Sequence, residues 1–296
     1  MIVKLQLKYF MISMTVIVFA LMVTLVLEKA CFAAEEIVPE WALKAQLRER
    51  RDPGRAKFAE LFKGNDGAYY GGEELAGIME GFLYGDVFSR GLLTDKQREL
   101  ITLAVLTTNQ NSEDIKAHVK AALNIGVTPE EIKEAVYQCA PYIGFTKALE
   151  GAYAMNEAFR EKNVKLPLAS KATVTETDRY AKGFVTQKSI FPTGLDGMYQ
   201  SSPANRKHVA EYLASFCFGD FYTRGAIDVK MREILTLCIL SALGGCESQV
   251  KSHVQANLNV GNGEDLMIEA ITQCLPFIGF PRTLNALACV AEAVKK

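Results

Sequence analysis

Apolar residues recur every three or four positions along most of the chain, which is the period of an amphipathic α-helix. The clearest case is the stretch 94–107, where charged residues in the first turn precede a broad apolar face. The apolar positions of that face are Leu100, Ile101, Leu103, Ala104 and Leu106. No sustained alternation of apolar and polar residues indicates a β-strand. The sequence therefore predicts an all-α protein.

Start and stop signals place the boundaries of further helices. Residues 112–124 form a predicted helix that Gly126 closes. The segment 128–131 opens the next helix, with threonine as N-cap, proline at the first helical position and glutamate at the third. Pro141 should kink or end that helix, because proline lacks an amide donor.

The chain carries this pattern twice. A motif around Gly85 returns around Gly219, and one around His118 returns around His253, with offsets of 134 and 135 residues. A repeat of this length indicates a duplicated domain rather than a solenoid. Pro276 should then break the second copy as Pro141 breaks the first. The predicted parts are a first domain at 55–160, a linker at 161–177 and a second domain at 178–296.

The start of the chain differs from the rest. Two lysines, an apolar run at 9–27 and a small-residue stretch ending at Ala34 have the layout of a signal peptide that spans 1–33. A retained membrane anchor formed by 9–27 is the rival interpretation. Both place the folded part outside the cytoplasm, in the periplasm or secreted. A polar lead-in at 40–51 should end at Asp52-Pro53-Gly54, and the lead-in helices of the two domains should correspond loosely at Arg55 and Arg179.

Charge and composition exclude several classes of protein. The chain has 33 basic and 34 acidic residues, so it offers no electrostatic basis for binding nucleic acid. Its 49% hydrophobic content is too high for a disordered chain. Three scattered histidines make no recognisable metal site, and nothing in the sequence implies a cofactor. The cysteines mostly lie in apolar helical runs and are expected to be free thiols.

Two of the three histidines, His118 and His253, occupy the repeated position. Glu99 and Glu233 occupy equivalent positions on the preceding helix. If each glutamate faces the histidine of the next helix, the pair is an acid–base unit. The alternatives are a core histidine and a structural Arg–Glu pair.

Cys246 stands seven residues before His253, where Asn111 occupies the matching place in the first copy. This spacing puts Cys246 on the same helical face as His253, near a helix N-terminus that favours thiolate. The paired Cys139 and Cys274 precede the two prolines, and packing is the expected reason for their repetition.

Together, the repeated R-E-[LI]-x-T-L, H-V-x-A-x-L-N-x-G and P-x-I-G-F motifs resemble the carboxymuconolactone decarboxylase family, which includes the AhpD-like alkylhydroperoxidases. The resemblance implies helical-bundle domains and a homo-oligomer, plausibly a trimer of tandem chains. It also implies a small-molecule substrate, with membrane contact only if the N-terminal segment is retained.

The decarboxylase branch of the family implies a lyase or isomerase that acts on a small carboxylated, lactone-type substrate. In that interpretation His118, Glu99 and Asp114 shuttle the proton in the first copy, and His253 and Glu233 do so in the second. The substrate anion would be oriented by four arginines, Arg90, Arg98, Arg224 and Arg232.

Two alternatives remain open. A thiol-dependent peroxidase of the alkylhydroperoxidase type would use Cys246, although Gln249 replaces the second cysteine of the usual pair. Its disulfide partner would be Cys274 or an external thiol. The other alternative is a non-catalytic binding or scaffold protein.

Overall fold

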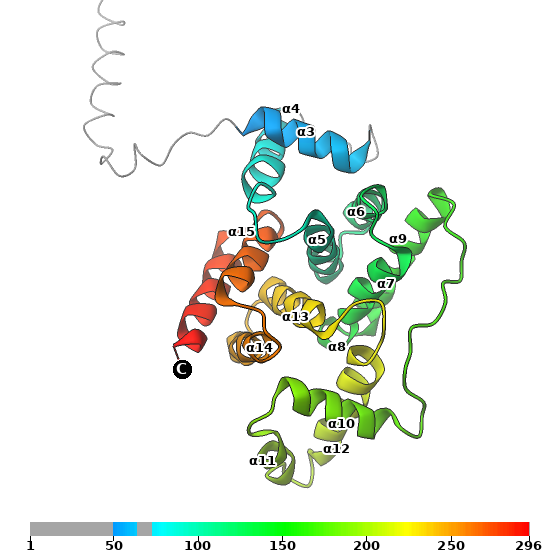
Figure 1. The fold of residues 1–296 in the computed structure, drawn as a ribbon, viewed down its shortest axis with the longest axis vertical. Coiled ribbons are helices and arrows are strands. Elements are labelled where there is room, and N and C mark those ends of the chain that lie inside the picture. Colours follow the sequence, from blue (N-terminus) through cyan, green and yellow to red (C-terminus); the bar gives the residue numbers. More distant parts are fainter. Residues whose placement is uncertain (1–49, 64–72, 296) are drawn as a thin grey trace, which may run out of the picture. The chain divides into compact units, whose positions relative to one another are not determined.

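Helices form all the regular structure of residues 50–63 and 73–295, which are the residues that the computed structural model describes. The all-α prediction is confirmed for this part of the chain (Figure 1). The predicted signal peptide and the alternative anchor at 9–27 lie outside the described residues. The helices of the first half are α3 (Arg51–Phe62), α4 (Glu73–Met79), the π-helical segment η2 (Glu80–Val87), α5 (Asp95–Asn109), α6 (Ser112–Asn124), α7 (Pro129–Gln138), α8 (Ala140–Ile143) and α9 (Phe145–Glu161). Those of the second half are α10 (Arg179–Ile190), α11 (Leu195–Gln200), α12 (Lys207–Tyr212), the π-helical segment η3 (Leu213–Tyr222), α13 (Val229–Leu243), α14 (Glu247–Asn259) and α15 (Glu264–Val294).

The predicted capping signals form as expected. Thr128 caps α7 through a reciprocal capping box with Glu131, which satisfies amide donors that the first turn leaves free. Gly126 follows the end of α6 with a φ of +81°, a conformation that glycine adopts without steric cost. These local signals set the start of α7 and the end of α6.

The two prolines that were predicted to break helices each lie three residues before a glycine with a positive φ angle. The prediction is confirmed for Pro141, since α7 ends at Gln138 and Pro141 lies in the short α8. It is wrong for Pro276, because α15 runs through that residue and bends at Gly279, whose φ is 75°. Gly144 has a φ of 81° at the matching place between α8 and α9. Pro276 lies within a turn of the bend, where one missing hydrogen bond costs little.

The entry helix differs from the expectation. α3 begins at Arg51 and includes Asp52, Pro53 and Gly54, since a proline near the start of a helix lacks only an amide that would be unpaired there anyway. The lead-in helices correspond through Arg50 and Arg179, which form salt bridges with Asp86 and Asp220 respectively. The expected match of Arg55 with Arg179 is therefore out of register by five residues.

The two halves share one hydrophobic core. α5 and α13 lie side by side (Figure 1), and their buried residues belong to the same cluster together with residues of α7 and α15. By length and composition, α15 could cross a membrane. Because it bends at Gly279 and packs on α5, α13 and α14, we interpret it as a core helix.

Candidate active site

The predicted histidine–glutamate contact is present in both halves. His118 on α6 places Nδ1 2.8 Å from Oε2 of Glu99 on α5. His253 on α14 places Nδ1 2.7 Å from Oε2 of Glu233 on α13. When the carboxylate is ionised it can only accept a hydrogen bond, and Nδ1 is then the donor. In the second pair, the other ring nitrogen, Nε2 of His253, can meet a substrate.

Both glutamates lie in the interior of the protein. Glu99 and Glu233 are fully buried, and among the described residues Oε1 of each carboxylate has no hydrogen-bond partner. A buried carboxylate oxygen without a partner is costly, and such groups concentrate at functional sites. Both halves therefore keep the geometry of an acid–base unit.

The surroundings of the two histidines differ in access. His253 is 11% exposed and lines a cavity of about 1090 Å³ between α14, η3, α11 and α12. His118 is fully buried and does not line that cavity. The ring of His118 lies between Phe62 and Phe277, with centroid distances of 5.4 and 5.9 Å. The second half therefore holds the histidine that a ligand in the cavity can reach.

Each half completes the histidine site of the other half. The ring of Tyr142, from the first half, lies edge-on to His253 with a centroid distance of 6.1 Å. Phe277 of the second half takes the same place beside His118. These two residues stand at the same position of the repeated P-x-I-G-F motif. Both sites are therefore built between the halves of one chain.

A hydroxyl cluster distinguishes the second site from the first. The Tyr142 hydroxyl lies 3.0 Å from that of Tyr222 and 3.2 Å from that of Thr236. Burial raises the pKa of both tyrosines well above the ordinary value, so both stay protonated and can donate hydrogen bonds. At the site of His118, Phe277 and Phe88 stand at the positions that match the two tyrosines. Sequence reasoning missed this cluster, although the Tyr142–Phe277 difference within a repeated motif was a readable signal.

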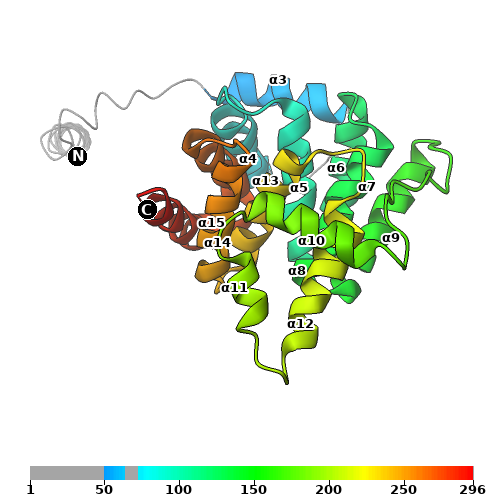
Figure 2. The same ribbon diagram turned by 60° about the horizontal axis from the view of Figure 1, so that its bottom comes forward.

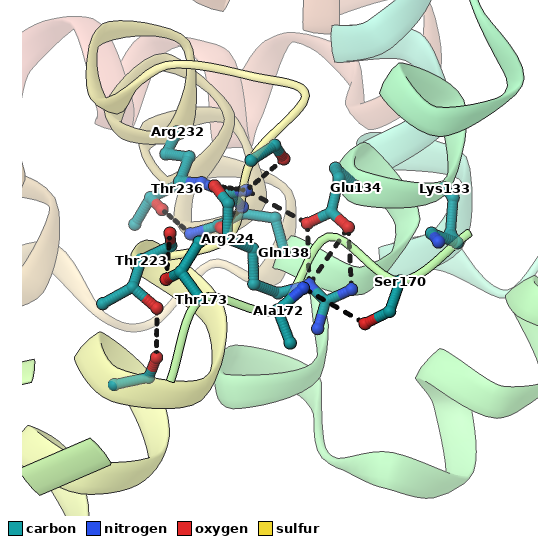
Figure 3. A network of polar contacts seen from close by, with 12 residues as sticks. Lys133, Glu134, Gln138, Ser170, Ala172, Thr173, Thr223, Arg224, Arg232 and Thr236 are labelled. Atoms are coloured by element: carbon teal, nitrogen blue, oxygen red, sulfur yellow. Dashed lines mark hydrogen bonds and ion pairs between the residues drawn. The ribbon is translucent and has the colours of Figure 1, made fainter. Parts of the chain in front are cut away.

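Two of the four arginines predicted to bind substrate pair with a glutamate of the first half. Figure 3 shows Glu134 of α7 facing Arg224 and Arg232. Oε2 of Glu134 lies 2.9 Å from Nε of Arg224 and 3.0 Å from an amine nitrogen of Arg232. Arg232 also donates to Gln138, whose amide reaches the hydroxyl of Thr236 at 3.2 Å.

The equivalent arginine of the first half, Arg98, contacts α15 of the second half. Arg98 forms a buried salt bridge with Glu269 and donates to Gln273 at 3.0 Å. Gln273 in turn reaches the hydroxyl of Thr102 at 3.2 Å. Arg90 lies 4.0 Å from the Glu269 carboxylate.

The four arginines do not line the cavity, and Arg98 and Arg232 are fully buried. The guanidinium groups of Arg98, Arg224 and Arg232 pair with glutamates of the opposite half. That the arginines orient a substrate anion stays a prediction.

Asp114, the third member of the predicted proton shuttle, lies one turn before His118. Its carboxylate accepts a hydrogen bond from Asn111 at 2.5 Å. Burial raises the pKa of Asp114, and the nearby His118 opposes this shift. Gln249 occupies the same place in the second half and lines the cavity beside His253.

The environment of Cys246 differs from the expectation. Burial first, then the charge of Glu247 and the proximity of Cys289, raises the thiol pKa instead of lowering it. The Cys246 thiol lies 3.2 Å from the Leu240 carbonyl, beside a small separate pocket that Cys289 also lines. Cys274, the expected disulfide partner, is fully buried next to Cys238. Thiol chemistry at Cys246 therefore gains no support from the geometry.

We expect Cys246 to react slowly with iodoacetamide at neutral pH. Because burial raises its pKa above the usual thiol value, thiolate makes up a smaller fraction of Cys246 at pH 7 than of free cysteine. Mass spectrometry of the alkylated peptide should show slower labelling than for free cysteine. The labelling rate should continue to rise at pH values at which the rate for free cysteine has levelled off. Labelling faster than free cysteine would contradict this environment.

Comparison with known proteins agrees with this architecture. Residues 73–157 and 207–292 each match the model of the Carboxymuconolactone decarboxylase family. The 4-carboxymuconolactone decarboxylase of Acinetobacter baylyi is 28% identical over 92 residues, which is 31% of this chain and 69% of that protein. The nitrosuccinic acid decarboxylase npaB of Metarhizium robertsii is 38% identical over 79 residues, which is 27% of this chain and 53% of that protein.

The chain spans about half the length of the second relative. Both relatives are named decarboxylases, which supports a decarboxylase-like function at modest identity. The two matched stretches together cover more than half of the sequence and coincide with the two repeats. The chain therefore belongs to the carboxymuconolactone decarboxylase family, as a member that carries two copies of the family domain in tandem.

Proposed function

We propose that the second half is a lyase site, in which His253 and Glu233 transfer a proton during the decarboxylation of a carboxylic acid. The observation that carries the proposal is the 2.7 Å contact between His253 Nδ1 and Glu233 Oε2 at the wall of a cavity of about 1090 Å³. The same contact in the first half is enclosed, so we assign that half a supporting role: it supplies Tyr142 to the site.

The proposed reaction needs a substrate with a carbonyl conjugated to the carbon that bears the carboxylate. The bond from that carbon to the carboxylate breaks, its electron pair moves into the conjugated carbonyl, and CO₂ leaves. The imidazolium of His253 then gives its Nε2 proton to the conjugated system at carbon, and the ring takes a proton back from water. Glu233 holds Nδ1 and stabilises the positive charge that the ring carries before the transfer.

The apolar cavity wall beside His253 favours a reaction in which a charged carboxylate becomes neutral CO₂. The ring of Phe191 lies 5.6 Å from the imidazole and 6.1 Å from the ring of Phe218, and both phenylalanines line the cavity. A carboxylate in such surroundings gives up its water shell, whereas neutral CO₂ loses nothing by leaving water. The apolar wall therefore favours the transition state over the bound acid.

CO₂ release in D₂O tests the reaction type. The assay would use purified protein and a panel of conjugated carboxylic acids that includes 4-carboxymuconolactone. We expect at least one acid to release CO₂ and to gain one deuterium on carbon. If CO₂ release by the wild-type protein is no faster than by His253→Gln for every acid, the proposal is wrong, and a non-catalytic binding protein becomes the better interpretation.

We also propose that tandem chains associate into a homo-oligomer, with a trimer as the expected form. Phe145 and Leu149 on α9 are 58% and 47% exposed, and Phe280 and Leu284 at the matching positions of α15 are 61% and 58% exposed. Repeated apolar residues on two surfaces favour association. Light scattering of Leu149→Glu and Leu284→Glu should then give a lower mass than the wild type, and an unchanged mass would contradict this interface.

A further inference from the structure

The cavity in the second half is larger than a small lactone acid needs. Its volume of about 1090 Å³ is slightly above the range of ~300–1,000 Å³ typical of pockets for drug-sized ligands. A single-ring acid bound at His253 would leave most of this space to water. Figure 2 shows that α11 and α12 extend away from the other helices and join at their far end. These two helices therefore enlarge the cavity beyond the surroundings of His253.

The walls of this extension are apolar and unusually open to solvent. Met198 of α11, Val209 of α12 and Leu213 of η3 line the cavity and are 41%, 57% and 39% exposed. Leu195 and Phe216 add to the same lining. Converging apolar side chains that remain in contact with water are typical of a binding site for an apolar ligand.

The far end of the extension carries a positive charge. Among the described residues that line the cavity, Arg206 is the only one with a permanent charge. Its side chain makes no hydrogen bond or salt bridge with any described part of the chain. Arg206 immediately precedes α12, which continues into η3, and Phe216 follows ten residues later. The six residues of α12 alone span about 9 Å at 1.5 Å per residue, and the π-helical η3 extends the separation further.

Phe218, two residues beyond Phe216 on η3, marks the histidine end of the cavity. Its ring lies 6.1 Å from that of Phe191, which in turn lies edge-on to His253. The cavity thus has a proton-transfer group at one end, apolar walls along its length and a guanidinium at the other end.

We propose that this cavity binds an elongated acid whose apolar body spans α12 and the start of η3, a length of more than about 9 Å. An anionic group at one end of the ligand pairs with Arg206, and the reacting carboxyl lies at His253. This inference rests on the proposed lyase function and names its substrate class: long diacids instead of small lactone acids.

Binding of unreactive diacids tests the substrate class without turnover. Dodecanedioate has a long apolar body, hexanedioate has the same two charges on a short body, and neither has a conjugated carbonyl. Isothermal titration of the full chain should show dodecanedioate binding at least ten times more tightly than hexanedioate. Arg206→Gln should weaken dodecanedioate binding roughly fivefold, as expected for a partly exposed ion pair, and leave hexanedioate unaffected.

Lys207→Gln is the matched control, since Lys207 is the next residue and does not line the cavity. It should leave both affinities unchanged. A further variant, Val209→Trp, would fill the apolar part of the cavity and should weaken dodecanedioate binding while Arg206 stays in place. Equal affinities for the two diacids, or an unchanged dodecanedioate affinity in Arg206→Gln, would overturn the proposal. If the diacid proposal fails in this way but CO₂ release is observed, the lyase function stands. If the diacids bind as expected but no CO₂ is released, the lyase function alone is refuted.

Discussion

Replacing His253 with glutamine is expected to lower the rate of CO₂ release by ~10²–10⁴, the usual contribution of a general acid or base. Glutamine keeps most of the side-chain volume and hydrogen-bonding capacity but cannot carry the proton. Steady-state kinetics in a CO₂-release assay measure the effect, which should fall on kcat more than on KM because proton transfer occurs only in the transition state.

The duplicated chain supplies its own control. His118→Gln removes the equivalent histidine from the enclosed pair and should leave kcat near the wild-type value. Glu233→Gln should lower kcat less than His253→Gln, since the imidazole stays in place but loses its charged partner. If His118→Gln is the more damaging variant, the assignment of the active half is wrong.

Replacing Glu134 with glutamine is expected to destabilise the protein by about 3–5 kcal/mol, the usual cost of breaking a buried ion pair. Glu134 is fully buried and accepts hydrogen bonds from Arg224 and Arg232 across the junction of the halves (Figure 3). Its loss leaves the buried guanidinium of Arg232 without a counter-charge. The free energy of unfolding from urea denaturation, followed by circular dichroism, measures the effect.

Glu157 provides the matched comparison for this experiment. It forms a 2.8 Å salt bridge with Lys116 at the surface, and its side chain is 53% exposed. Glu157→Gln should change the free energy of unfolding far less than Glu134→Gln, because solvent screens an exposed pair. A similarly small effect for Glu134→Gln would show that the cross-repeat network contributes little to stability.

The repeated motifs predicted the core of the site. Because a histidine and a glutamate recur at matched positions of neighbouring helices, the contacts of His118 with Glu99 and of His253 with Glu233 followed from sequence. The contacts of the arginines could not be predicted from the sequence in the same way. Arg98 pairs with Glu269, a partner 171 residues away in the other half, and sequence spacing holds no information about such a contact.

The errors at Cys246 and Pro276 have local causes. Helical spacing placed Cys246 on the same face as His253, but Cys246 is the N-cap of α14, with φ −133° and ψ 41°, so helical periodicity does not apply to it. Pro276 was expected to break its helix, yet Gly279 three residues later provides the bend. In each case one backbone conformation at the end of a helix decided the outcome.

The shape of the cavity was beyond the reach of sequence reasoning. Arg206, Met198 and Val209 belong to α11, α12 and their connection, a segment that the repeated motifs do not include. Comparison of the two halves therefore gave no information about these residues. Their role depends on tertiary structure, in which α12 packs against η3.

Modification by diethyl pyrocarbonate tests the central claim, that the accessible His253 carries the activity. Peptide mass spectrometry would follow His118, His208 and His253 while CO₂ release is measured in the same samples, with the exposed His208 as the reactive reference. We predict that His253 is modified, that activity falls at the same rate, and that the fully buried His118 resists the reagent. Full activity after complete modification of His253 would contradict the account.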